Sequence, residues 1–143
     1  MKVLSIQEPY ASMILNGKKT IETRTWKTKY RGKILLHASS KPKSEISGKI
    51  FAIANIVDCK DMIKEDEKKA CCKIYKNACS WFLEDVRPTA LLEVNGSLGL
   101  WNYSGEIALK EEKFYCQNCK KEVKFGVEHC NNCGRIQLWA LFG

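Results

Sequence analysis

The stretch GKKTIETR, residues 17 to 24, decides how the N-terminal part of this chain folds. Residues 9 to 16 precede it and begin with proline, which suits the first turn of a helix. Gly17 suits the left-handed residue that ends a helix. Residues 20 to 26 are rich in threonine, isoleucine and tryptophan, which favour an extended strand. The sequence therefore predicts a short helix, a turn and then a strand.

The same octet brings three charged side chains towards one place. Side chains alternate along a strand, so Glu22 and Arg24 point to one face, about 7 Å apart. Lys19 lies in the turn before the strand, from which its amine reaches the same spot. An acid, a guanidinium and an amine that converge form a site for a polar ligand. The alternative is an ordinary ion pair on the sheet surface, with Lys19 in solvent.

Composition and charge limit the classes of protein to which the chain can belong. Its 143 residues make one ordinary domain, and no run approaches 18 apolar residues. The N-terminus has no signal-peptide pattern, so we expect a soluble, cytoplasmic protein that does not bind membranes. Residues 18 to 49 hold ten basic and two acidic side chains, and ten minus two equals the whole net charge of +8. This favours RNA or another single-stranded nucleic acid as partner, with a merely solubilising surface as the alternative.

The remaining pattern predicts a mostly β (α+β) fold, a small β-barrel with two or more flanking helices. The predicted elements are strands over 1–6, 33–38 and 49–57, a helix from Asp61 towards Asn77, a strand with Trp81 and Leu83 that ends before Pro88, and a strand over 98–101. We place this barrel domain at residues 1–109.

Four cysteines near the C-terminus form a C-x2-C-x10-C-x2-C pattern: Cys116, Cys119, Cys130 and Cys133. Each C-x2-C pair points two thiolates at one centre, and two pairs complete a tetrahedron, so zinc is the expected occupant. Iron in the same cage is the alternative. Four thiolates leave no position for water, so the metal is expected to be structural. Residues 110–143 are thus predicted to form a four-cysteine, zinc-ribbon-like extension, with a small hairpin through 123–127 and a closing strand over 136–142.

The other cysteines and one histidine are expected to be structural. Cys59, Cys71, Cys72 and Cys79 have no metal-ligand spacing and lie within apolar runs, so we expect them in the core. His37 lies alone on a predicted strand, where packing is the favoured interpretation.

Several motifs together resemble the activating signal cointegrator homology (ASCH) family. They are LSIQEPYA at 4–11, G-x-K-x-x-E-x-R at 17–24, Trp26, and YRGK at 30–33. The resemblance covers about the first 105 residues and leaves the cysteine pattern outside. It implies a PUA-like β-barrel (the fold named after pseudouridine synthases and archaeosine transglycosylases), with a cleft between barrel and first helix. It also implies a module that binds RNA or is linked to RNA modification.

Carried onto this sequence, the resemblance implies a ligand-binding cleft built around the charged octet. Its residues would be Lys19, Glu22 and Arg24, with Ser5, Gln7 and Tyr10 at the rim. Tyr10 and Trp26 are candidates for stacking on exposed bases, and Arg31 belongs to the basic run that would follow an RNA backbone.

A hydrolase acting on a modified nucleoside or on RNA is the alternative, because some family members are enzymes. Lys19 and Glu22 would then be the catalytic residues. Small bacterial members that hydrolyse acetylated cytidine use a threonine three residues after the lysine. That position is Glu22 here, so the threonine mechanism does not carry over. A protein-binding adaptor acting through the cysteine extension is a third hypothesis.

Overall fold

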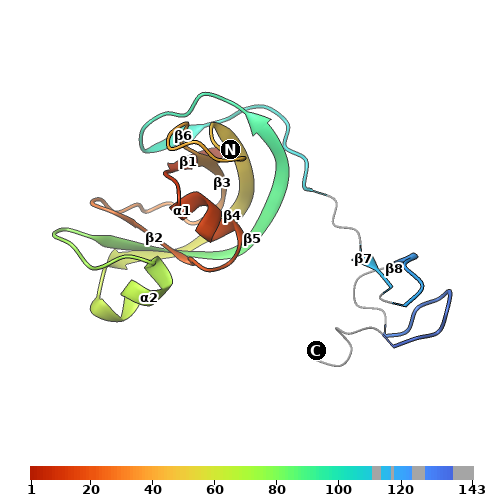
Figure 1. The fold of residues 1–143 in the computed structure, drawn as a ribbon. Helices are drawn as coiled ribbons and strands as arrows, with labels where there is room; N and C mark the ends of the chain where they lie inside the picture. Colours follow the sequence, from red (N-terminus) through yellow and green to blue (C-terminus); the bar gives the residue numbers. More distant parts are fainter. Residues whose placement is uncertain (111–113, 117, 124–127, 137–143) are drawn as a thin grey trace. The chain divides into compact units, whose positions relative to one another are not determined.

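The computed structural model describes residues 1–110, 114–116, 118–123 and 128–136. The chain divides into two compact units, Met1–Lys110 and Glu111–Gly143, and the predicted division after residue 109 lies one residue away. The first unit is a curled sheet with two short helices (Figure 1).

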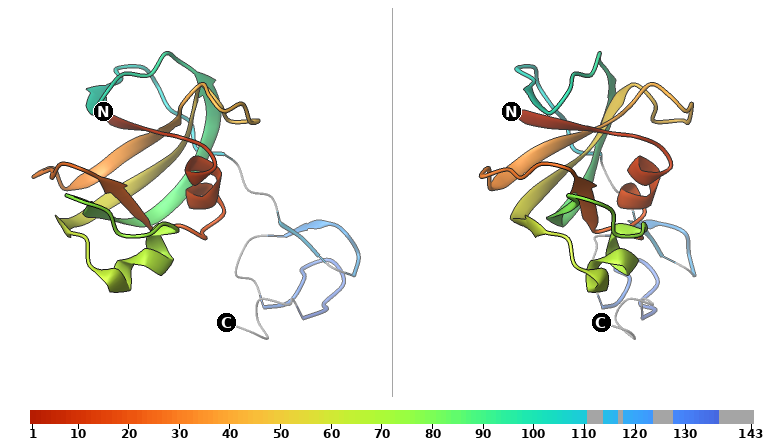
Figure 2. Two further views of the ribbon diagram at one scale, coloured as in Figure 1. Left: turned by 60° about the vertical axis from the view of Figure 1, so that its left-hand side comes forward. Right: turned by 90° about the vertical axis from the view of Figure 1, so that its left-hand side faces the viewer.

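The sheet has six strands in the order β2-β5-β4-β3-β1-β6. Its strands are β1 (Lys2–Ile6), β2 (Ile21–Arg24), β3 (Gly32–Ala38), β4 (Lys49–Asp61), β5 (Cys79–Glu93) and β6 (Leu100–Asn102). β1 and β3 pair in parallel, and all other neighbours are antiparallel. The register between β4 and β5 shifts at three places, and such bulges increase bending, so both long strands curl into a half-barrel (Figure 2). The fold is the mostly β, PUA-like barrel predicted from the sequence.

The core lies inside the curl and is closed on one side by α1 (Tyr10–Leu15). Apolar side chains from four strands pack there against Ala11 and Ile14 of the helix, and Trp81 of β5 is fully buried. A smaller cluster under α2 contains Ile21 of β2. This packing holds Ile21, the first residue of β2, in place and so orients the charged residues that follow it.

The predicted helix, turn and strand of the octet are present. α1 lies within the predicted range, and Gly17 has a φ of +84°, in the left-handed region. The Glu8 carboxylate accepts hydrogen bonds from the backbone N–H and the hydroxyl of Ser12, at 2.7 and 2.6 Å, and so caps the first turn. Burial alone would raise the pKa of Glu8, but hydrogen bonds from Ser12 and Ser44 outweigh it and lower the pKa.

The predicted helix from Asp61 to Asn77 is wrong in length. The structure has a 3-10 turn, Lys64–Asp66, followed by one α-turn, α2 (Glu67–Ala70), and Cys71 then takes a φ of +57°. The Ala70 carbonyl accepts a hydrogen bond from the Lys19 amine instead of a helical N–H. The N–H of Ile74 donates to Glu67 Oε2 at 2.7 Å. The helix thus ends at Ala70, where Cys71 turns left-handed and the Lys19 amine satisfies the carbonyl in place of a further helical N–H.

The predicted end of a strand before Pro88 is also wrong, because β5 continues through it to Glu93. Proline cannot donate to a ladder, and Pro88 lies beside one of the register shifts, where a missing donor is tolerated. Its carbonyl accepts a bond from the N–H of Lys110.

The four cysteines expected in the core are only in part buried there. Cys79 is buried, and burial raises its pKa, whereas Cys59, Cys71 and Cys72 are half-buried. Cys72 lies near a cleft described below, where its sulfur is 3.7 Å from the Thr23 hydroxyl.

In the second unit, β7 (Phe114–Tyr115) and β8 (Glu122–Val123) form a small antiparallel pair. The predicted closing strand, apart from its first residue, and most of the predicted 123–127 hairpin lie outside the described residues. None of the described helices is long and apolar enough to cross a membrane.

Candidate ligand-binding cleft and metal site

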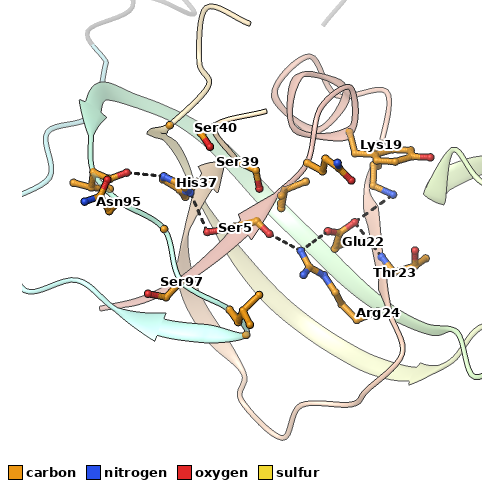
Figure 3. A pocket seen from close by; sticks show the side chains of 18 of the residues that line it. Ser5, Lys19, Glu22, Thr23, Arg24, His37, Ser39, Ser40, Asn95 and Ser97 are labelled. Carbon is orange, nitrogen blue, oxygen red and sulfur yellow. Dashed lines mark hydrogen bonds and ion pairs between the residues drawn. The ribbon is translucent and has the colours of Figure 1, made fainter. Parts of the chain in front are cut away.

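A cleft of about 1060 Å³ opens on the first unit, walled by β1, α1, β2, β3 and the segment after β5 (Figure 3). Six of the eight residues predicted to bind a ligand line it: Ser5, Gln7, Tyr10, Lys19, Glu22 and Arg24. These six residues therefore lie around one cleft, and whether they bind a ligand stays a prediction.

The three charged residues of the octet converge on this wall, with Glu22 in the middle (Figure 3). Lys19 Nζ lies 3.6 Å from Glu22 Oε1, and Arg24 Nη2 lies 2.9 Å from Glu22 Oε2. The side chains of Lys19 and Glu22 are 1% and 8% exposed, and that of Arg24 is 24% exposed. The surface ion pair with a solvated lysine, the alternative from the sequence, does not describe this arrangement.

Each of these charges is held by further contacts. The amine of Lys19 donates to the Ala70 carbonyl and lies 5.0 Å from the centre of the Tyr10 ring. Burying a charge is costly unless it is paired and hydrogen-bonded, and Glu22 provides that partner. Two cations and one carboxylate leave a formal charge of +1 on the cleft wall (2 − 1 = +1).

Ser5 connects this cluster to the other end of the cleft. Its carbonyl accepts a hydrogen bond from Arg24 Nη2 at 2.7 Å. Its hydroxyl accepts from the indole N–H of Trp101 at 3.1 Å and donates to His37 Nδ1 at 2.9 Å. His37 Nε2 carries the proton, because its partner at 2.9 Å, the Val94 carbonyl, can only accept. His37 is buried and structural, as expected, but it also lines the cleft.

The segment from Val94 to Gly99 lies closely over this network. A Cβ atom on Gly96 would lie 2.7 Å from His37 Cε1 and 2.8 Å from the Ser5 hydroxyl oxygen. No side chain fits there without displacing its neighbours, so glycine is needed for space.

Trp26 and Arg31 differ from the expectation, since among the described residues both lie outside the cleft lining. The Trp26 ring packs edge-on against Trp81, with 4.7 Å between centroids, and its carbonyl accepts the Trp81 indole N–H. The guanidinium of Arg31 donates to the carbonyls of Thr28 and Tyr30, both at 2.9 Å.

Sequence reasoning missed several residues of the cleft. Tyr75, which falls within the predicted helix from Asp61 to Asn77, is exposed and lines the cleft. Asn95, Ser97 and Leu98 line it from the segment after β5. The glycine- and serine-containing run NGSLG at 95–99 was the available signal, because such runs form turns at the ends of strands.

The basic region of residues 18–49 is partly neutralised. Four of its ten cations form ion pairs: Lys19 and Arg24 with Glu22, Lys27 with Asp61 at 3.0 Å, and Arg31 with Asp58 at 3.7 Å. The hydrogen bond that the Lys27 ammonium donates to Asp61 raises the pKa of Lys27. The field around the cleft is therefore weaker than the sequence total suggests.

In the second unit, the four predicted metal ligands lie together, with all sulfur atoms within 4.8 Å of one another. The sulfur of Cys116 is 3.6 Å from that of Cys133, and Cys119 is 3.7 Å from Cys130. Four sulfurs about 2.3 Å from a central zinc stand about 3.8 Å apart, so the spacing fits a tetrahedral ion. The set could hold a metal.

The two cysteine pairs share one backbone design. The N–H of Asn118 donates to Cys116 Sγ at 3.4 Å, and that of Asn132 donates to Cys130 Sγ at 3.3 Å. Lys120 and Gly134, each four residues after the first cysteine of its pair, both have a positive φ. N–H groups placed in this way stabilise thiolates at a metal site.

Comparison with known proteins places this architecture in a family. The ASCH domain model matches residues 4–125 of the chain. The chain belongs to the ASCH family. The match continues past the 105 residues of the resemblance and includes Cys116 and Cys119, so the extension is not wholly outside it.

Two solved ASCH structures support the fold. The crystal structure of ASCH from Zymomonas mobilis has a TM-score of 0.52 and 17% identity, covering 65% of this chain and 73% of that one. A point mutant of the same protein has a TM-score of 0.52 and 17% identity, covering 65% of this chain and 75% of that one. Comparison with curated proteins found no match. At 17% identity the likeness concerns the fold alone.

Proposed function

We propose that this ASCH protein binds single-stranded RNA, or a nucleotide within it, through the cleft around Lys19, Glu22 and Arg24. The observation that carries the proposal is a carboxylate held between two cations on the wall of an open cleft, with net positive charge. A modified nucleoside would use the same cleft.

RNA-binding modules usually grip unpaired bases by stacking them on aromatic rings and by hydrogen-bonding their edges. Tyr10 and Tyr75 are aromatic residues in the cleft lining, and Tyr75 is exposed. Arg24 directs one nitrogen, Nη2, to both Ser5 and Glu22, and a guanidinium has donors on two further nitrogens. The cleft thus combines a stacking surface with charged hydrogen-bonding groups.

The test is fluorescence anisotropy of the full chain with a labelled single-stranded RNA, at about 50 to 200 mM salt. The logarithm of the affinity should fall with a slope of about 0.7 per neutralised phosphate. Arg24→Gln should weaken binding by about tenfold or more, because it removes a cation and a charged hydrogen-bond donor.

Arg87→Gln is the matched control. Arg87 also pairs with the acid two residues before it, Asp85, at 3.0 Å, but it is exposed and outside the cleft lining. This variant should change the affinity less than twofold. Equal losses in both variants, or an affinity that does not respond to salt, would contradict the proposal.

Hydrolysis of a modified nucleoside or of RNA is the second candidate, favoured by the contact between the buried Lys19 amine and Glu22. Glu22 would act as general base, and Lys19 would stabilise developing negative charge. Turnover of acylated cytidines and of single-stranded RNA should then be lost in Lys19→Met. Lys60→Met is the control, because the amine of Lys60 lies 5.1 Å from the Phe82 ring centre but outside this cleft. Activity that survives Lys19→Met would exclude this chemistry.

We also propose that the four cysteines bind a structural zinc ion that stabilises residues 111–143. Four thiolates complete the coordination, so the ion would hold the fold and leave no position for a substrate. Elemental analysis of the purified protein should give about one zinc per chain, falling in Cys130→Ser and unchanged in Cys59→Ser. Strong visible absorption with iron in place of zinc would overturn the choice of metal.

A further inference from the structure

We propose that the cleft selects bases with an imide edge, that is, uracil and the bases that share its row of O4, N3–H and O2. This inference rests on the proposed function, since it names the base that the RNA-binding cleft prefers. Its origin is the fixed order of Lys19, Glu22 and Arg24, which presents a donor, an acceptor and a donor.

The order of the three groups follows from their contacts. The two carboxylate oxygens of Glu22 face opposite partners, Oε1 towards Lys19 at 3.6 Å and Oε2 towards Arg24 at 2.9 Å. Figure 3 shows Glu22 between the other two. An ammonium and a guanidinium only donate, and an ionised carboxylate only accepts. An amide side chain can exchange its donor and acceptor by turning over, but these three groups cannot exchange roles.

The row is also held in place from behind. Lys19 is anchored on the Ala70 carbonyl, Arg24 on the Ser5 carbonyl, and Glu22 on the Thr23 N–H at 3.1 Å. Anchored groups lose little freedom when a ligand binds, which favours discrimination between ligands.

The row keeps hydrogen-bonding capacity for a ligand. A carboxylate offers about four lone-pair sites, and the hydrogen bonds described from Thr23 and Arg24 use two of them. An ammonium has three donors, and Ala70 takes one of those of Lys19. Glu22 and Arg24 can therefore meet a flat base that enters edge-on, and Lys19, which is 1% exposed but still lines the cleft, completes the row.

The pyrimidine edges differ in a way that this row detects. Uracil presents acceptor, donor and acceptor, which complements the row in either direction. Cytosine presents its N4 amino group as donor, then N3 and O2 as acceptors. When it enters in the same position as uracil, its N3 acceptor faces the Glu22 carboxylate, which is also an acceptor, and no hydrogen bond forms. Cytosine can satisfy two positions only by slipping sideways, and one cation then faces no partner. A site built from fixed polar groups rejects a ligand that leaves one of them unpaired.

The purines are ranked by the same comparison. Guanine offers an acceptor and a donor that suit Lys19 and Glu22, but its amino group then opposes Arg24. Adenine places its N1 acceptor opposite Glu22. We therefore expect uracil first and guanine second, with cytosine and adenine last.

The experiment measures the affinity of the wild-type chain for three RNA heptamers at one ionic strength: uridine, cytidine and 3-methyluridine. All three carry the same phosphate charge, and 3-methyluridine keeps both carbonyls but lacks N3–H. We expect the uridine heptamer to bind about tenfold more tightly than either of the others, because each loses one well-made contact. Heptamers of pseudouridine and 5-methyluridine share the imide edge, and their affinities show which of the bases with that edge the cleft binds.

Variants add a second measurement. A glutamine at position 22 can donate to N3 of cytosine, so Glu22→Gln should reduce the uridine-to-cytidine ratio towards one. Asp85→Asn, the same change on an exposed pair outside the cleft lining, should leave the ratio unchanged. If Glu22→Gln does not fold, the heptamer series on the wild type still decides.

The outcomes separate this inference from the proposed function. Salt-dependent binding of all heptamers with equal affinity, or tighter binding of 3-methyluridine or cytidine than of uridine, overturns the base preference and leaves RNA binding in place. Absence of binding to any single-stranded RNA overturns both.

Discussion

Two places in the barrel hold the same short pattern, an acid followed two residues later by an arginine, and use it differently. On β2, Glu22 and Arg24 pair at 2.9 Å, and on β5, Asp85 and Arg87 pair at 3.0 Å. The first pair is 8% and 24% exposed, and the second is 52% and 60% exposed. Nearly equal distances thus describe a cleft wall in one case and a solvated surface pair in the other.

The local backbone accounts for part of this difference. β2 is regular, and Glu22 lies opposite Trp81, whose ring is fully buried. Asp85 has a φ of +52° and lies in a bulge, where the register passes from the Asn55–Glu84 pair to the Ile53–Arg87 pair. A third charge, Lys19, reaches only the first pair. The two pairs share the same sequence spacing and nearly the same distance. What makes Glu22 and Arg24 a candidate site is therefore their burial and the third charged partner, Lys19.

The largest effect is expected when the buried acid is neutralised. Glu22→Gln should lower the free energy of unfolding by about 3–5 kcal/mol, because it leaves two cations without their carboxylate in a largely buried setting. Urea unfolding measures this. A loss below about 1 kcal/mol would mean that the Glu22 cluster behaves like a surface pair.

An intermediate effect is expected at Glu8, an acid held by neutral donors. Glu8→Gln should cost about 1 kcal/mol at pH 7, because it weakens the cap on α1. The folded pKa of Glu8 lies below its ordinary value of 4.5, so its contribution is complete above that pH and is lost as the pH falls through the folded pKa. Melting temperatures from pH 6 to pH 3 should therefore fall less steeply in the variant. Parallel curves for both proteins would contradict the lowered pKa.

The smallest effect is expected at the exposed pair. A double-mutant cycle of Asp85→Asn and Arg87→Gln should give a coupling free energy of about 0.2–1 kcal/mol, because solvent screens both charges. The coupling should fall at 1 M salt, where the screening length is about 3 Å. A coupling that does not fall there would remove the contrast with β2.

The sequence predicted the parts of the cleft that depend on local geometry. Gly17 ends α1 and the alternation of β2 puts Glu22 and Arg24 on one wall, and both features lie within eight residues. The contact between Lys19 and Ala70 joins residues 51 positions apart, so no local pattern predicts it.

Trp26 illustrates another limit of sequence reasoning. Two-residue alternation from Arg24 would place it beside the charged residues, but β2 ends at Arg24 and the alternation ends with it. Its ring packs on Trp81 instead. By contrast, each C-x2-C pair of the second unit fixes its own geometry, and the gathering of its four sulfurs was predictable from spacing alone.

The burial of Lys19 has a practical consequence for probing the molecule by chemistry. Reagents that acylate amines should modify the exposed lysines of the folded chain first and Lys19 far more slowly, because its amine is bonded to the Ala70 carbonyl and paired with Glu22. Since its amine is tied to the last residue of α2, the appearance of label at position 19 would report that this helical turn has opened. The chain thus contains its own sensor of local unfolding beside the cleft.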